Sequence, residues 1–129
     1  MDKVSFKSAP AIGTNAADVV YAYNTSGHKV RIDGLSLLPD VTVALDASNY
    51  ITTTVVAPDG STTLSTHTTE SAGSALAAGT EEELTLGAAA IGEAIEVENG
   101  EAVKFSIAKT GTGPAYDFVG VVRATVVRP

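Results

Sequence analysis

Few side chains in this chain could carry out catalysis. It contains two histidines, His28 and His67, and no cysteine, so thiolate nucleophiles, thiolate metal ligands and disulfide bonds are excluded. His28 follows Gly27 at a turn, and His67 has the opposite parity to Leu64 in a Thr-rich run, so both are expected to face solvent. Neither histidine has a carboxylate at metal-ligand spacing, and the sequence therefore predicts no metal site.

The motifs that mark nucleophilic or nucleotide chemistry are missing from the sequence. No serine lies in a Gly-x-Ser-x-Gly elbow, and there is no Walker-type phosphate loop. The segment 110–114 reads Thr-Gly-Thr-Gly-Pro, which has Gly-x-Gly without a third glycine or a following helix. Asn24-Thr25-Ser26 matches a glycosylation sequon, which has meaning only in a secretory pathway. We therefore predict no catalytic residue and no cofactor.

Carboxylates are the remaining candidates for chemistry. Paired acids hydrolyse glycosides, and Glu81–Glu83 and Glu93–Glu101 supply such acids. Those of the second group alternate with Ile95 and Val97, which is typical of a solvated strand face. Sugar sites also use stacking aromatic rings, whereas this chain has no Trp and four Tyr. No EF-hand-like spacing accompanies the acids. The sequence therefore indicates a structural or binding protein and not an enzyme.

The elements that would position a site are short strands. The 129 residues match the size of one domain, and a core of Val, Ile, Leu and Ala is expected because only 5% of residues are aromatic. Charged and apolar residues alternate over 28–33, and the phase flips after Gly34, which indicates a β-bulge. The Pro58-Asp59-Gly60 turn between two Thr-rich runs predicts a hairpin. Turns at this spacing predict an all-β antiparallel sandwich, jelly-roll-like in form.

The first sixteen residues lack sustained periodicity and are interpreted as an extended N-terminal arm, with residues 17–129 as a single β-sandwich domain. Such an arm is either a frayed terminus or a segment that orders on a partner. For the second case, the candidate contact residues are its apolar and basic side chains, Lys3, Val4, Phe6 and Lys7.

The last run, 116–127, is apolar on both faces. Phe118 and Val122 lie on one face, and Val119 and Val121 on the other. A strand without polar alternation is buried on both sides. Either it is a central strand covered within the chain, or Val119 and Val121 form a subunit interface.

Charge is unevenly distributed along the chain. The net charge is −7, and no Lys or Arg occurs between Arg31 and Lys104, a stretch that carries every Glu. The two ends are mildly basic, and they would meet if the terminal strands pair. This pattern either favours solubility or gives the molecule an acidic end and a neutral-to-basic docking end. An acidic chain without a basic cluster argues against nucleic-acid binding. We also expect no membrane span and no signal peptide, and hence synthesis in the cytoplasm.

The order of strand-like segments resembles small viral jelly rolls. The segments are 30–35 (VRIDGL), 50–56 (YITTTVV), 98–105 (ENGEAVKF) and 119–126 (VGVVRATV). In particular, the region from Asp18 to Val127 is similar to head decoration, or cement, proteins of tailed bacteriophages, in which a turn-plus-strand like ENGEAVKFSI precedes the final strand.

The resemblance implies a structural virion protein without enzymatic activity. Such a protein binds the major capsid protein on the outside of the capsid, commonly as a homotrimer, and braces the shell. It implies no nucleic-acid or membrane partner, and the arm would be the capsid-contact element. The alternatives are a receptor-binding or adhesion tip of a phage fibre, or another structural binding module.

Overall fold

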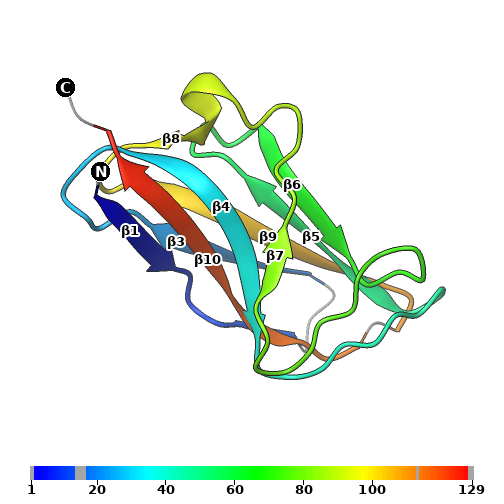
Figure 1. The fold of residues 1–129 in the computed structure, drawn as a ribbon. Helices are drawn as coiled ribbons and strands as arrows, with labels where there is room; N and C mark the ends of the chain where they lie inside the picture. The colour runs from blue at the N-terminus through cyan, green and yellow to red at the C-terminus, as the bar shows by residue number, and fades with distance from the viewer. Residues whose placement is uncertain (1, 14–16, 113, 128–129) are drawn as a thin grey trace.

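The computed structural model describes residues 2–13, 17–112 and 114–127, and almost all regular structure in them is β-strand. The strands form two antiparallel sheets that pack face to face around one hydrophobic core (Figure 1). The prediction of an all-β antiparallel sandwich is confirmed. In the described part of the chain, no helix is long and apolar enough to cross a membrane.

The first sheet, called sheet A, holds the first and last strands of the chain. Its hydrogen-bonded order is β1-β10-β4-β7, while β2 also pairs with β10 and β8 with β4. The strands of sheet A are β1 (Lys3–Lys7), β2 (Ala11–Ile12), β4 (Val30–Pro39), β7 (Glu82–Leu84), β8 (Glu96–Val97) and β10 (Asp117–Val126). The apolar last strand, β10, therefore lies inside the sheet, between β1 and β4.

The second sheet, called sheet B, has the order β3-β9-β5-β6. Its strands are β3 (Ala17–Tyr23), β5 (Tyr50–Val56), β6 (Thr63–Thr68) and β9 (Ala102–Thr110). A short 3-10 turn, η1 (Gly92–Ile95), precedes β8. The chain passes repeatedly between the two sheets, so residues far apart in sequence share the core.

The core is built from the inward-facing residues of both sheets. On β9 the alternating residues Val103, Phe105 and Ile107 are buried, as their spacing predicts. Opposite them on β10, Gly120 leaves space for the Phe105 ring: a Cβ at Gly120 would lie 2.6 Å from three of its carbon atoms. The Phe105 ring therefore packs directly against the backbone of β10 at Gly120.

The predicted N-terminal arm is instead part of sheet A. Residues 3–7 pair with β10 along their whole length, from Lys3 opposite Thr125 to Lys7 opposite Val121. Phe6 is buried in the core, because alternate residues of a paired strand point to opposite faces. The interpretation of this segment as an arm separate from the sandwich is wrong for residues 2–13, because residues 3–7 and 11–12 both pair with β10, more than 100 residues away in the sequence. Met1 and residues 14–16 of the predicted arm lie outside the described residues.

Two local predictions are confirmed. The register of β4 against β10 shifts so that Gly34 and Ile32 face consecutive residues, which leaves Asp33 as the extra residue of a bulge. The predicted hairpin is formed by β5 and β6, and the Gly60 N–H donates to the Ala57 carbonyl within its turn.

Two further segments contain little regular structure. Within the alternating run Val41, Val43 and Leu45, Val43 makes an isolated bridge to Leu76. The described part of the segment between β7 and β8 contains the single 3-10 turn η1.

Candidate functional site

The four residues predicted to contact a partner divide between the two faces of β1. Val4 and Phe6 point inward, where Phe6 is buried and Val4 packs against the core. Lys3 and Lys7 point outward and are exposed. The two apolar residues are therefore unavailable to a partner, and Lys3 is already engaged within the chain.

The two valines predicted to form a subunit interface lie on the outer face of β10. Val119 is half-buried, while Val121 is only 2% exposed. Val121 faces Lys7 of β1 and Ser36 of β4 across the sheet, so neighbouring strands flank it on both sides. The central-strand alternative accounts for the burial of Val121 without a second subunit.

The outer face of sheet A is a network of ion pairs. Lys3 Nζ lies 3.1 Å from an Asp33 carboxylate oxygen that also accepts a hydrogen bond from the Thr125 hydroxyl. The Thr125 hydroxyl and the Lys3 ammonium lower the pKa of Asp33 below its usual value. Arg123 Nη1 lies 2.7 Å from Glu81 Oε1, and this contact lowers the pKa of Glu81 and raises that of Arg123.

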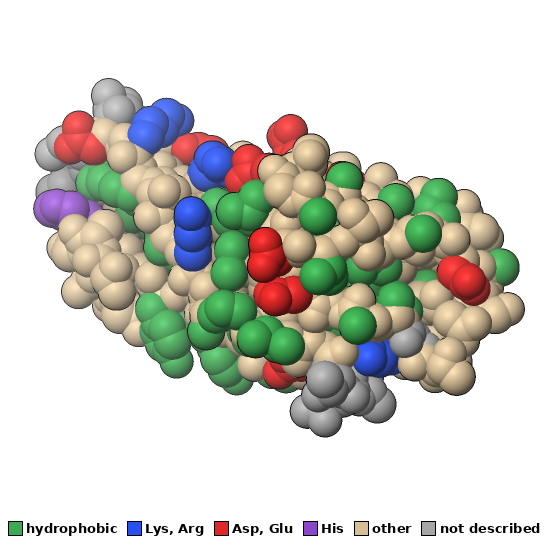
Figure 2. All heavy atoms as spheres, turned by 90° about the horizontal axis from the view of Figure 1, so that it is seen from below, with side chains coloured by type: hydrophobic (Ala, Val, Ile, Leu, Met, Phe, Trp, Pro, Cys, Tyr) green, Lys and Arg blue, Asp and Glu red, His purple; other side chains and the backbone are tan. Residues whose placement is uncertain are grey.

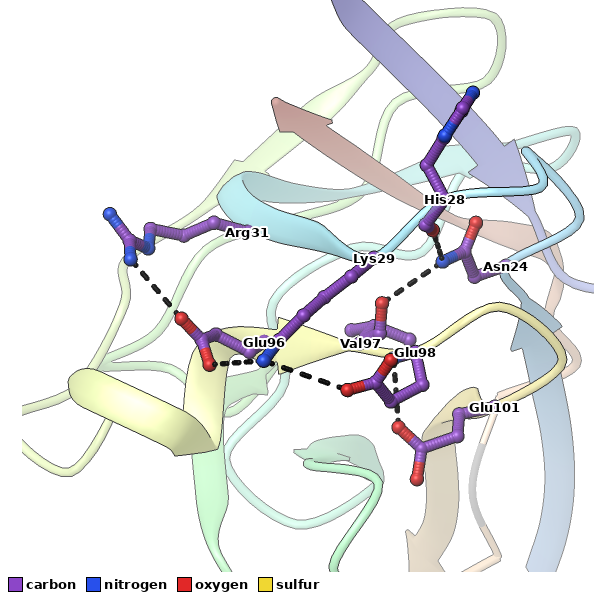
Figure 3. Close-up of polar contacts among 8 residues, drawn as sticks. All are labelled: Asn24, His28, Lys29, Arg31, Glu96, Val97, Glu98 and Glu101. Carbon is purple, nitrogen blue, oxygen red and sulfur yellow. Dashed lines mark hydrogen bonds and ion pairs between the residues drawn. The ribbon is translucent and has the colours of Figure 1, made fainter. Parts of the chain in front are cut away.

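The same pattern continues where β4 pairs with β8 (Figure 3). Lys29 Nζ lies 3.2 Å from Glu96 and 3.5 Å from Glu98, and Arg31 donates a 3.1 Å hydrogen bond to the other oxygen of Glu96. Hydrogen bonds from Arg31 and Lys29 lower the pKa of Glu96. The basic ends of the sequence do meet, but acids from the middle of the chain pair with Lys3, Lys29, Arg31 and Arg123. They therefore do not form a bare basic docking end, and Arg128 lies outside the described residues.

The outer face of sheet B is different in kind. The edge strand β3 presents Val19, Tyr21 and Tyr23, which are between 44% and 53% exposed. The two tyrosine rings lie side by side, with centroids 6.1 Å apart and planes tilted by 36°. Their neighbours on β9 are small or carry one charge: Ala102 faces Tyr23, and Lys104 faces Tyr21. Figure 2 views the molecule from below, where hydrophobic side chains are interspersed with basic and acidic ones.

The rest of this face is flat and uncharged. Ser106 and Ala108 of β9 are followed by Thr52 and Thr54 of β5 and then by threonines of β6. Among the strand residues described on this face, Lys104 alone carries a charge. A face with exposed tyrosines and few charges has the composition of a protein interface core.

Asn24, directly after β3, connects the turn before β4 with β8 through side-chain hydrogen bonds (Figure 3). Its side chain is fully buried, and its amide nitrogen donates to the carbonyls of His28 (2.8 Å) and Val97 (3.0 Å). Its side-chain oxygen accepts from Ser26. Because the amide is buried and engaged, the sequon at Asn24 serves the fold and is closed to glycosylation.

His67 is buried between the sheets, contrary to the sequence prediction. Its side chain is 7% exposed, and neither ring nitrogen has a hydrogen-bond partner in the described structure. Glu82 approaches Nε2 at 3.5 Å from the edge of sheet A. Burial lowers the pKa of His67, and the Glu82 carboxylate only partly opposes this. The prediction failed because a bulge at Leu64 in the β5–β6 register reverses the parity of the residues that follow.

In the part of the chain that the structure describes, no group of three or more His, Asp or Glu side chains is placed to hold a metal ion. Comparisons with protein-family models, with curated proteins and with solved structures each find no match to this chain. The outer face of sheet B is thus the candidate functional site on its own geometry. The period-two spacing of Val19, Tyr21 and Tyr23 predicts that they share one strand face, whereas their exposure depends on the position of β3 at the edge of the sheet, which sequence alone does not give.

Proposed function

We propose that this protein is a structural virion protein that binds the outside of a phage capsid and stabilises it, and that it docks through the outer face of sheet B. The observation that carries the proposal is the row of exposed Val19, Tyr21 and Tyr23 on a face with a single described strand charge. Interface cores are depleted of charged residues and enriched in tyrosine, which contributes large rigid contact area at low entropic cost.

The strand order supports the same proposal. Eight strands that wind between the sheets in the orders β1-β10-β4-β7 and β3-β9-β5-β6 agree with the jelly-roll form of the resemblance. Double-sheet jelly rolls are common in viral capsid proteins, although the fold alone does not determine function.

The proposal changes the contact surface that the resemblance implied. Phe6 and Val4 are committed to the core, so β3 and β9 replace the first residues of the chain as the capsid contact. The proposed homotrimer forms on the capsid, because Val121 is covered within the chain. Light scattering at micromolar concentration is expected to give the mass of a monomer, and a stable trimer would contradict this part of the proposal.

Co-sedimentation tests the capsid proposal. The chain is mixed with capsids assembled from the major capsid protein encoded in the same genome, and pelleted protein is measured. Val19→Glu places a charge in the proposed contact, and Leu45→Glu is the matched control, since Val19 is 44% and Leu45 43% exposed. We expect at least tenfold weaker binding for Val19→Glu, the size of effect seen for central interface residues, and wild-type binding for the control. Equal binding by all three proteins would remove sheet B from the proposal.

A fibre-tip or adhesion module is the second candidate, and the Tyr21–Tyr23 pair favours it because sugar rings stack on exposed aromatic faces. Binding of the isolated chain to host cells, together with failure to pellet with capsids, would replace the capsid proposal by this one.

A further inference from the structure

A groove runs from the outer face of sheet B onto the end of the sandwich. It consists of two hollows, one of about 320 Å³ beside Tyr21 and Tyr23 and one of about 400 Å³ beside Lys29. Ala57, Pro58 and Glu101 line both hollows, so the two adjoin. The walls come from the β5–β6 turn and from the turn between β8 and β9.

The first hollow is aromatic. The tilted rings of Tyr21 and Tyr23 stand next to the apolar surface of Pro58. Tyrosine faces attract ammonium and guanidinium groups, and they also pack against the aliphatic stems of Lys and Arg. Lys104 and Glu101 also line this hollow, one cation and one acid. This half of the groove therefore suits the aliphatic stem of a long basic side chain as well as an apolar side chain.

The second hollow is acidic, and this favours a basic side chain over an apolar one as the occupant of the groove. Lys29 is the one cation among its lining residues, which include five carboxylates: Asp59, Glu93, Glu96, Glu98 and Glu101. Lys29 is shared between Glu96 and Glu98 (Figure 3). Within the described residues, no ion pair is recorded for Glu93 or Glu101. Glu101 uses one oxygen to accept the Glu98 N–H, and its other oxygen remains open to a cation.

Charge complementarity argues against two other occupants. A second copy of the chain would bring a net charge of −7 to an acidic rim, and most described cations of sheet A are already paired. A neutral glycan would stack on the tyrosines but would leave the excess negative charge uncompensated.

We propose that the Tyr21–Tyr23 groove is the docking site for a basic segment of the partner protein, with Arg or Lys side chains stacked on the tyrosines and directed toward Glu93 and Glu101. The identity of the partner rests on the proposed function, whereas the chemistry of the groove does not. The outer face of β9, β5 and β6 then contributes contact area, and the groove makes binding specific for a cationic partner.

Titration calorimetry of the full chain with a synthetic peptide of five Arg-Gly repeats tests this chemistry directly. We expect measurable binding at about 50 mM salt that weakens at about 300 mM, because exposed charge pairs are screened. The same peptide with Glu in place of Arg, and chitotetraose as a neutral sugar, are expected not to bind.

Substitutions locate the site. The double variant Glu93→Gln, Glu101→Gln keeps an amide oxygen that can accept the Glu98 N–H, and Tyr23→Ala removes one aromatic face. We expect each to weaken peptide binding about two- to fivefold, the range of exposed cation–π and charge contacts. Glu83→Gln, an exposed acid on the opposite sheet, is the matched control and is expected to bind like wild type. Absence of peptide binding, equal weakening by Glu83→Gln, or preference for chitotetraose would overturn the inference.

Capsid pelleting of the same variants separates this inference from the proposed function. Capsid binding that depends on Val19 but is unchanged in Glu93→Gln, Glu101→Gln would reject the groove and retain the docking face. Peptide binding to the groove without capsid binding by the wild-type chain would retain the groove and reject the capsid.

Discussion

The two outer faces of the sandwich arise from the same alternation of side chains along strands, but they differ in charge and in how far their side chains are paired within the chain. On sheet A, cations from the two ends of the chain pair with acids from its middle, as in Lys3–Asp33 and Arg123–Glu81. On sheet B, tyrosines, a valine and small polar residues stand without such partners. Most cations of sheet A are thus paired within the chain, whereas sheet B exposes apolar and aromatic surface of the kind that marks interaction sites.

The comparison also corrects a simple interpretation of charge. The sequence separates basic ends from an acidic middle, which suggests a molecule with two electrostatic ends. Folding places β1, β4 and β10 side by side and brings those charges together on one face. A contrast along the sequence therefore becomes a contrast between a charged face and an uncharged one.

The largest effect is expected from removing β1 and β2, which would leave β10 paired with β4 on one side only. Deletion of residues 2–12 exposes the edge of β10 and removes Phe6 from the core. Losing a whole strand and its core side chain costs more free energy than the marginal stability of a single domain. We therefore expect no cooperative unfolding transition in urea. A truncated chain that unfolds cooperatively near the wild-type midpoint would show that the segment is a dispensable arm.

A second prediction concerns the contact between the two sheets at Gly120 and Phe105. Gly120→Ala places a Cβ 2.6 Å from the Phe105 ring, and overpacking of this kind costs about 1–3 kcal/mol of unfolding free energy. Gly34→Ala is the control, because no heavy atom lies within 4 Å of its added Cβ. Adding Phe105→Leu to Gly120→Ala is expected to recover part of the loss, and full additivity of the two losses would contradict the contact.

Acidification is expected to act on the link between sheets through His67. Because burial lowers the pKa of His67 in the folded chain, the unfolded chain takes up a proton first as pH falls below 6.5. The free energy of unfolding should therefore fall from pH 6.5 toward the folded pKa, with a slope of up to about 1.4 kcal/mol per pH unit.

Urea unfolding at half-unit steps measures this slope. His67→Leu should remove it, and His28→Leu, at an exposed histidine, should keep it. The acids with lowered pKa, such as Asp33 and Glu81, lose their contribution only as pH falls below their ordinary pKa values of 3.8 and 4.5, so the slope just below pH 6.5 is assigned to His67. An unchanged slope in His67→Leu would assign it to another group.

The smallest effects on stability are expected from single substitutions on the two outer faces, and their salt dependence distinguishes the faces. Arg123→Gln on sheet A should lower the unfolding midpoint slightly, and the difference should vanish in 1 M salt because the ion pair with Glu81 is exposed. Tyr21→Ser on sheet B should lower the unfolding midpoint slightly and by an amount that does not depend on salt, because the ring is 45% exposed and loses only its packing, mainly against Tyr23. A salt-dependent loss for Tyr21→Ser would show that the face is engaged within the chain.

Local sequence pattern was sufficient for much of the fold. Alternation gave the inner face of β9, and turn chemistry gave the hairpin at Pro58-Asp59-Gly60. What it missed depends on long-range pairing: the place of Phe6 in the core follows from a strand partner at the far end of the chain. His67 was misplaced because one extra residue at Leu64 reverses the strand's parity, and no glycine marks that bulge. The three exposed residues of β3 were predicted to share a face, but their availability required knowing that β3 is an edge strand.

Lysine acetylation of the capsid-bound protein, read by mass spectrometry, tests the central claim most directly, because each face carries its own reporter. Lys104 lies on the outer face of sheet B, and Lys3 and Lys7 lie on that of sheet A. We predict that Lys104 is protected on the capsid while Lys3 and Lys7 react as they do in the free protein. Protection of Lys3 and Lys7 with an unchanged Lys104 would contradict the account and assign docking to the ion-paired face.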